Sequence, residues 1–374
     1  MKVLLHNVAG GYGGAERTLE LLIPHFQAKM EVWVAGQNPR FCDQIIKLSA
    51  TFPLTLVRPT VGRSPLNIFA GVIRTVRLCW KERFDSVILN SNKSAMLFAL
   101  CHRLIPRHTK IIVFVRDFQW TNARFIFWAL RSRALFYAPS EAVSELWPAH
   151  YGPHKMPGVI PSPFSPKTKK NVLLKVIPDC QESGGGGQLP MGRKFLILGT
   201  INAWKGIDTA ILAMAQIADE YPDVTLSIVG QSFDKKVHLD LLSLVKMHRL
   251  EERVIFTSHQ DDITKVIQEH LCLVSASVPW NGGPETFGRT IIESWAMLRP
   301  VIASRCGGPK YLITEEVDGL FFEPGDADGL ANAFRRILDD PVLMWTMAVN
   351  GREKFMRNFT SESVAKSFIK VMES

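Results

Sequence analysis

The sequence lacks any pair of cysteines at the spacing used by metal sites or redox motifs. Its 374 residues include six cysteines with no CxxC motif among them: Cys42, Cys79, Cys101, Cys180, Cys272 and Cys306. Cysteines scattered in this way support neither a disulfide framework nor a zinc site. We therefore interpret them as mostly buried thiols and expect no bound metal.

Long apolar runs are also missing. No uncharged stretch approaches the ~18–20 residues that a membrane-spanning helix requires. The segment from Met1 to Leu5 is too short, and is followed too soon by polar residues, for a secretory signal. These two features predict a cytoplasmic protein.

Acidic residues are scarce in the first half of the chain. Residues 1–160 contain 20 Lys and Arg but 9 Asp and Glu, a balance of +11, whereas residues 161–374 contain 24 and 26, a balance of −2. This asymmetry predicts that the first half meets an anionic partner, which is a membrane surface, a pyrophosphate-carrying acceptor or nucleic acid.

Two stretches, residues 74–83 and 116–133, interleave arginine with tryptophan or phenylalanine. This composition suits the headgroup region of a membrane, and no nucleic-acid-binding fold is recognisable. We therefore prefer peripheral contact with an anionic membrane, on its inner face, to contact with nucleic acid. A partly buried aromatic helix with a basic outer face is the alternative.

Apolar runs of strand length alternate with amphipathic stretches along most of the chain, which predicts α/β architecture with parallel sheets wound with helices. A polar, glycine-rich stretch interrupts the alternation and is predicted as a linker, residues 166–193. It separates an N-terminal domain (1–165) from a C-terminal domain (194–355), and residues 356–374 are predicted as a final helix that packs back on the first domain. Strands are predicted at 3–5, 31–35, 54–57, 86–89, 110–115 and 134–138, and then at 195–198, 224–229, 254–257, 271–274, 301–303 and 320–322.

Polar and glycine residues follow several of these strands, where ligands of doubly wound sheets bind. Gly13 and Gly14 follow the first strand, and Lys205 lies in a loop after the first strand of the second domain. A dinucleotide fingerprint would need an acid after the second strand, but Ala35-Gly36-Gln37 stands there. Candidate acceptor residues at other strand ends of the first domain are Asn90, Asn92, Lys93, Arg116 and Asp117.

Glu285 and Glu293 stand eight positions apart around the start of a predicted helix, residues 288–298. A helical rise puts them ~12 Å apart, too far for a carboxylate pair acting on one glycosidic bond, which needs ~5–9.5 Å. Two acids at the longer spacing suit opposite ends of an extended ligand such as a nucleotide-activated sugar, with Gly288 and the helix start facing its diphosphate. The alternative is that Glu285 lies near the cap of an acidic first turn and Glu293 is simply solvated on an amphipathic helix.

Taken in order, six motifs resemble the retaining nucleotide-sugar glycosyltransferases of family 4, which have the GT-B fold of two Rossmann-like domains facing across a cleft. The motifs are Leu198-Gly199 to Lys205-Gly206, Val229-Gly230, Glu285 to Glu293, Gly307-Gly308, Asp318-Gly319-Leu320 and Pro324-Gly325-Asp326. The resemblance implies that Lys205 and Glu285 are catalytic, that Glu293 binds ribose, and that Gly13 and Gly14 approach phosphate or acceptor. It also implies donor contacts for Gly199, Asn202, Phe287, Gly288 and Arg289.

The chain departs from the family pattern at Thr200, where the family commonly has arginine, and at Arg116, where it often has histidine. We expect a retaining glycosyltransferase that uses a UDP- or GDP-sugar without an obligatory cofactor and acts on a saccharide or lipid-linked acceptor in polysaccharide or glycolipid biosynthesis. The two departures leave open a catalytically weak binding or scaffold subunit. A nucleotide-sugar epimerase on the same fold is a further alternative.

Overall fold

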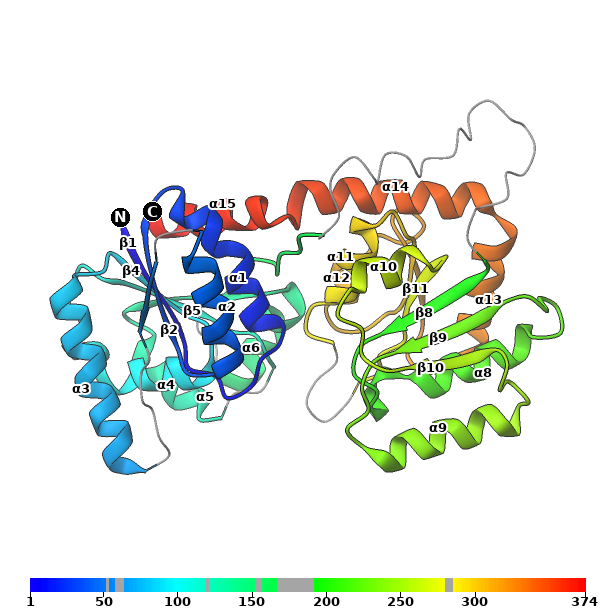
Figure 1. Cartoon of the computed structure of the whole chain (residues 1–374), viewed down its shortest axis with the longest axis horizontal. Coiled ribbons are helices and arrows are strands. Elements are labelled where there is room, and N and C mark those ends of the chain that lie inside the picture. Colours follow the sequence, from blue (N-terminus) through cyan, green and yellow to red (C-terminus); the bar gives the residue numbers. More distant parts are fainter. Residues whose placement is uncertain (52–53, 58–63, 119–120, 152–156, 167–191, 280–284) are drawn as a thin grey trace. The chain divides into compact units, whose positions relative to one another are not determined.

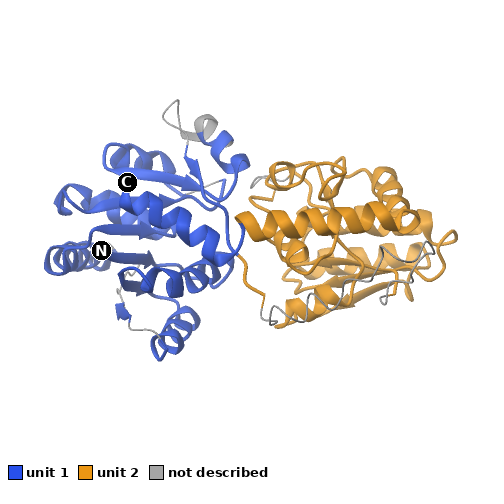
Figure 2. Cartoon of the chain, turned by 90° about the horizontal axis from the view of Figure 1, so that it is seen from above, with its two compact units in different colours: residues 1–163, 359–374 blue, residues 164–358 orange. Residues whose placement is uncertain are grey.

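The computed structural model describes residues 1–51, 54–57, 64–118, 121–151, 157–166, 192–279 and 285–374. The chain forms two compact units (Figures 1 and 2), of which unit 1 comprises Met1–Pro163 with Phe359–Ser374, and unit 2 comprises Phe164–Asn358. Nearly all of the predicted linker, residues 166–193, lies outside the described residues.

Unit 1 contains a seven-stranded parallel sheet in the order β3-β2-β1-β4-β5-β6-β7. The order reverses between β1 and β4, and the loops that leave the carboxyl ends of these strands form the expected ligand-binding edge. Central strands such as β4 are buried along their whole length. The strands are β1 (Lys2–Asn7), β2 (Glu31–Gly36), β3 (Thr55–Val57), β4 (Ser86–Leu89), β5 (Lys110–Phe114), β6 (Ala134–Ala138) and β7 (Gly158–Val159).

The helices of unit 1 include one from the far end of the sequence, α15, which lies beside α1 (Figure 1). The Phe368 ring of α15 packs against Phe26 and Phe114, with centroid separations of 6.1 and 5.4 Å. The C-terminal helix therefore contributes to the core of unit 1. The helices are α1 (Gly14–Gln27), α2 (Pro39–Ser49), α3 (Pro65–Glu82), α4 (Asn92–Cys101), the short 3-10 helix η1 (His102–Leu104), α5 (Ala123–Leu130), α6 (Glu141–Tyr151) and α15 (Ser361–Glu373).

Unit 2 repeats this topology in a six-stranded parallel sheet with the order β10-β9-β8-β11-β12-β13, which reverses between β8 and β11. Its core is closed in part by Phe195 and Phe334, whose ring centroids lie 4.2 Å apart. The strands are β8 (Lys194–Leu198), β9 (Thr225–Val229), β10 (Val254–Thr257), β11 (Cys272–Ser275), β12 (Val301–Ser304) and β13 (Leu320–Phe322). The helices are η3 (Ala203–Lys205), α8 (Ile207–Ile217), α9 (Lys235–Met247), α10 (Ile263–Gln268), α11 (Arg289–Ala296), α12 (Pro309–Leu312), α13 (Ala327–Asp339) and α14 (Pro341–Asn358).

The five described cysteines are buried, and Cys180 lies outside the described residues. Burial raises the pKa of the Cys79 and Cys101 thiols to about 12, which makes them poor nucleophiles. Within the described part of the chain, no three His, Cys, Asp or Glu side chains gather as metal ligands would. A search of the described helices finds none with the length and apolar character needed to cross a membrane.

Candidate active site

The loop after β8 is held in place at both ends by backbone contacts. Gly199 has φ +137°, and its N–H donates to the Val229 carbonyl at 3.0 Å. At the other end the Val278 N–H donates to the Trp204 carbonyl at 2.9 Å, which ties the loop to the segment after β11. Since β8 and β11 flank the point where the strand order reverses, this loop lies where a doubly wound sheet binds ligands.

Asn202 begins the short helix η3 within this loop. Its side-chain carbonyl oxygen is buried and has no hydrogen-bond partner among the described residues. A buried acceptor without a donor is costly unless a ligand or water supplies one, so this atom is available to a bound molecule.

Glu285 lies in an extended segment before α11, and the Gly307-Gly308 loop fixes its backbone. The Gly308 N–H donates to the Glu285 carbonyl at 2.7 Å. A Cβ atom at Gly308 would lie 2.5 Å from the backbone of Phe287, so only glycine allows the two segments to approach this closely. The sequence predicted Glu285 and Gly307-Gly308 only as separate motifs. In the structure the two segments are hydrogen-bonded and packed together.

The Lys205 ammonium and the Glu285 carboxylate form an ion pair with a distance of 2.6 Å between Nζ and Oε2. Both side chains are 18% exposed, and the Lys205 ammonium also lies 4.1 Å from the centroid of the Trp204 ring. The two residues are 80 positions apart in the sequence. The structure thus brings together the two side chains that the sequence predicted as catalytic.

Glu293 projects from the first turns of α11 and is 3% exposed. Its Oε1 accepts a hydrogen bond from Arg289 Nε at 2.9 Å, one helical turn earlier. Gly288, with φ +94°, caps the helix, which begins at Arg289 rather than at the predicted residue 288. A buried carboxylate oriented by arginine is suited to accept hydrogen bonds from ligand hydroxyls.

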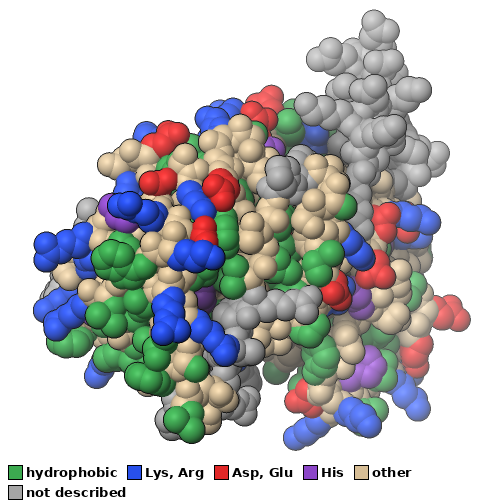
Figure 3. Space-filling view, turned by 60° about the vertical axis from the view of Figure 1, so that its left-hand side comes forward, with side chains coloured by type: hydrophobic (Ala, Val, Ile, Leu, Met, Phe, Trp, Pro, Cys, Tyr) green, Lys and Arg blue, Asp and Glu red, His purple; other side chains and the backbone are tan. Residues whose placement is uncertain are grey.

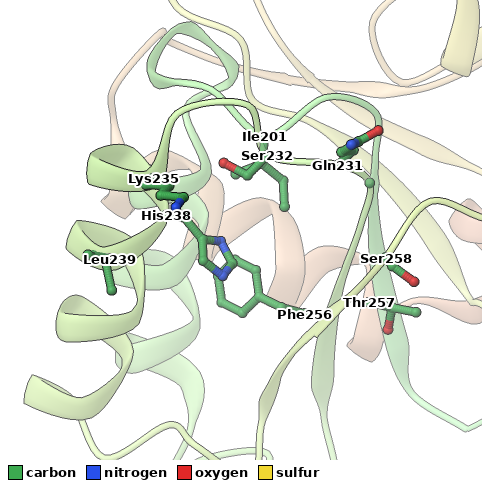
Figure 4. Close-up of a pocket in the computed structure, with 10 residues that line it drawn as sticks. Ile201, Gln231, Ser232, Lys235, His238, Leu239, Phe256, Thr257 and Ser258 are labelled. Carbon is green, nitrogen blue, oxygen red and sulfur yellow. The ribbon is translucent and has the colours of Figure 1, made fainter.

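A cavity of about 490 Å³ lies between α9 and the ends of β9 and β10 (Figure 4). The rings of His238 and Phe256 lie edge to face with centroids 5.3 Å apart, and His238 Nδ1 has no hydrogen-bond partner in the described part of the chain. Ile201 links the cavity to the loop after β8. None of the predicted donor residues lines this cavity.

In unit 1 a continuous chain of hydrogen bonds joins Arg116 to the glycine loop. Arg116 donates to Asn90 Oδ1 from two nitrogens, at 2.6 and 3.0 Å, and Asn90 Nδ2 donates to Asn7 Oδ1 at 3.2 Å. Asn7 Nδ2 then donates to Glu16 Oε1 at 3.0 Å, and the second oxygen of Glu16 accepts from the Gly13 N–H at 2.8 Å. Asn7 and Glu16 were not predicted, because their role follows only from the adjacency of β1, β4 and β5 to α1.

The remaining candidate acceptor residues lie close to this network. Asn92 starts α4 and donates to the Thr121 carbonyl at 3.2 Å, while Lys93 is exposed with its ammonium near Gly10. Gly14 opens α1, and like Gly13 it is exposed. Asp117 follows Arg116 and is exposed. These residues collect at the carboxyl edge of the unit 1 sheet, as the strand-end argument predicted.

A sequence comparison finds a family match within unit 2. The profile described as Glycosyl transferases group 1 matches residues 192–340. We call this matched segment the group 1 domain. The group 1 domain contains every residue predicted to bind the donor, from Gly199 to Glu293.

Curated relatives of the group 1 domain are themselves glycosyltransferases by name. The chain is 29% identical over 170 residues to the lipopolysaccharide core biosynthesis glycosyltransferase LpsE of Rhizobium meliloti, which covers 46% of each protein. It is 29% identical over 189 residues to the human alpha-1,3/1,6-mannosyltransferase ALG2, covering 47% of this chain and 44% of that protein. The matched region therefore spans less than half the length of either relative.

The whole chain resembles a solved structure in fold. The HepE protein of Anabaena, crystallised with UDP, aligns over 100% of both chains with a TM-score of 0.81 and 20% identity. This likeness confirms the predicted fold class, α/β of the GT-B type with two Rossmann-like units.

Proposed function

We propose that the protein is a retaining glycosyltransferase that moves a sugar from a nucleoside diphosphate sugar to a saccharide or lipid-linked acceptor in polysaccharide or glycolipid biosynthesis. The observation that carries this proposal is the Lys205–Glu285 ion pair at the strand-order reversal of a group 1 domain. The UDP in the HepE structure supports a nucleotide donor.

The ion pair gives each partner a role during transfer. A donor diphosphate brings more negative charge to Lys205 than one carboxylate does, so it replaces Glu285 as the partner of the ammonium. Glu285, whose backbone stays fixed through Gly308, is then free to face the positive charge that develops on the sugar. Lys205 and the first amides of α11 stabilise the departing diphosphate.

Glu293 is proposed to hold the donor's ribose. Its burial and its hydrogen bond to Arg289 fix the carboxylate as an acceptor for ribose hydroxyls. The acceptor is assigned to the carboxyl edge of unit 1, where Lys93 presents an exposed ammonium to sugar hydroxyls or an anionic linker and Asn90 orients the Arg116 guanidinium. Charge asymmetry supports a cytoplasmic location with peripheral attachment to the inner face of a membrane.

Donor binding is testable by calorimetry and thermal shift with UDP, GDP, ADP and their sugars. We expect one nucleotide to bind selectively and to raise the unfolding temperature by mass action. Lys205→Ala and Glu293→Gln should each weaken this binding, by about tenfold or more, through loss of a charged hydrogen-bond partner. Lys246→Ala, an exposed lysine on α9, is the matched control and should bind as wild type does. Equal binding by all four proteins would refute the donor site.

Glu285→Gln separates binding from transfer. Since this change releases Lys205 from its ion pair, nucleotide affinity should stay equal or rise, whereas the transfer rate should fall on the order of 100-fold. Product NMR establishes the anomeric configuration, and retention is expected. Selective donor binding without turnover on any acceptor would instead favour the scaffold function suggested by the exposed Thr200. Conversion of the donor sugar without acceptor would favour the epimerase.

A further inference from the structure

Helix α3 presents three large apolar side chains to solvent. Leu66, Phe69 and Trp80 are 81%, 64% and 62% exposed. The buried positions of the same helix include Thr75 and Cys79. A surface helix ordinarily turns its large apolar side chains toward the core, so the three exposed ones on α3 mark a candidate contact surface.

The apolar stripe of α3 continues across the neighbouring helices. α4 contacts both α3 and α5, so the three helices form one surface. Trp80 Nε1 donates to the Leu104 carbonyl at 2.8 Å, which joins α3 to η1. We call this surface the α3–α5 face and define it by its exposed apolar residues, Leu66, Phe69, Trp80, Leu100, Leu104, Phe125 and Trp128.

Basic residues surround the apolar ones, and acids are nearly absent. Between residues 64 and 135 the sequence has 12 Lys and Arg but three acids, one of which, Glu82, is already paired with Lys2. Hydrophobic and basic side chains are interspersed on the lower part of the face of unit 1 that points forward in Figure 3. The exposed basic residues in α3, η1 and α5, or directly after α5, are Arg74, Arg77, Lys81, Arg103, Arg124 and Arg131.

We propose that the α3–α5 face docks unit 1 on an anionic lipid bilayer. Its aromatic and leucine side chains enter the boundary between headgroups and acyl chains, while the arginines bind lipid phosphates. A second copy of this chain is a poorer partner, because a symmetric contact would set one basic face against another. The inference rests on the proposed function in one respect, because a membrane-docked unit 1 would meet a lipid-linked acceptor at the membrane.

Vesicle flotation of the full chain tests the docking surface. We expect binding to phosphatidylcholine vesicles that contain phosphatidylglycerol, weaker binding at high salt, and little binding to phosphatidylcholine alone. The double variant Phe69→Ser/Trp128→Ser should lower vesicle binding about tenfold or more. Arg77→Glu/Arg124→Glu should lower it by a similar factor. Because all four side chains are exposed, the unfolding temperature should not change.

Matched controls come from unit 2. Phe233 is 77% exposed, and Phe233→Ser, like Lys246→Glu, should leave vesicle binding unchanged. Wild-type protein that fails to float with anionic vesicles, or α3–α5 variants that float as well as wild type, would overturn the inference. A change of oligomeric state in the variants, measured by sedimentation with flotation intact, would assign the face to a contact between copies instead.

Nucleotide binding, measured without vesicles, keeps this inference separate from the proposed function. Intact nucleotide binding with failed flotation would overturn the docking surface alone. Flotation that depends on the α3–α5 face in a protein that binds no nucleotide would leave the docking surface standing and remove the proposed donor site.

Discussion

Gly206 occupies a left-handed backbone conformation, with φ +61°, directly after Lys205. A Cβ atom there would lie 1.9 Å from the Ala276 carbonyl oxygen. Glycine is therefore required for two reasons, the sign of φ and the close approach of the segment after β11. The loop that carries Lys205 therefore needs glycine at position 206 to pack against this segment.

The variant Gly206→Ala tests this requirement for glycine, and Gly325→Ala is the matched control. Gly325 also has positive φ, +81°, but no atom lies within 4 Å of its added Cβ. Both changes should cost about 1–2 kcal/mol of unfolding free energy from backbone strain, and Gly206→Ala about 1–3 kcal/mol more from overpacking. Denaturant unfolding measures the difference. Equal losses would show that the Ala276 contact moves aside freely.

His6 makes the stability of unit 1 depend on pH. Burial lowers the pKa of its imidazole from 6.5 to about 4. The folded protein therefore keeps His6 neutral where the unfolded chain takes up a proton, so its contribution to stability is complete above pH ~6.5 and is lost as the pH falls toward ~4.

His6→Asn should remove this dependence. Wild type should lose about 3 kcal/mol of unfolding free energy between neutral pH and pH ~4 beyond the loss shown by the variant. Because other titrating groups contribute equally to both proteins, the difference isolates His6. The exposed His108→Asn should follow the wild-type curve. Parallel curves for wild type and His6→Asn would contradict the assignment.

Individual site residues differed in how far the sequence could reveal them. Lys205 was named because it lies in a loop between Gly199 and Gly206, and Glu285 and Glu293 because of their spacing around Gly288 and the start of a predicted helix. Asn7 and Glu16 were missed, because an asparagine that ends a strand and an acid in a first helical turn are ordinary features. Their hydrogen bonds to Asn90 and Gly13 depend on which strands are neighbours.

At the scale of elements, the strands were predictable because helices cover both faces of a parallel sheet and leave continuous apolar runs. β8 was predicted at 195–198 and occupies Lys194–Leu198. β7 was not predicted, since Gly158–Val159 is a two-residue edge strand defined only by its pairing with β6.

The outward stripe of α3 shows the limit of pattern-based prediction for helices. Periodicity locates an apolar stripe on a helix, but it does not show whether that stripe faces the sheet or the solvent. In α3 the buried positions include the small residues Thr75 and Cys79, whereas Leu66, Phe69 and Trp80 remain exposed. The sequence therefore predicted a stretch rich in basic and aromatic residues. Which of these side chains are exposed depends on how the helix packs in the folded unit.

At the scale of the whole molecule, unit 1 is assembled from two distant parts of the sequence. α15 packs on α1, and Phe368 is buried between Phe26 and Phe114. Residues 359–374 are thus part of the folding unit formed by residues 1–163.

Phe368→Ala should destabilise unit 1 selectively, by about 3–5 kcal/mol, because it leaves a cavity among aromatic side chains. Hydrogen exchange read by mass spectrometry should show faster exchange in β1 and α1 and no change in β8 and α8. Phe334→Ala, in the core of unit 2, should give the reverse pattern. Faster exchange in both units of either variant would contradict separate cores.

The sequence by itself determined the alternation of strands and helices and the glycine-bounded loops, because these depend on local periodicity and backbone conformation. It also marked Lys205, Glu285 and Glu293 as candidate site residues through their motifs. Tertiary structure alone decided that Lys205 meets Glu285 across 80 residues, that Asn7 and Glu16 connect Arg116 to Gly13, and that α3 turns its aromatic side chains outward. These features depend on strand order and on the packing of distant segments, which no local pattern records.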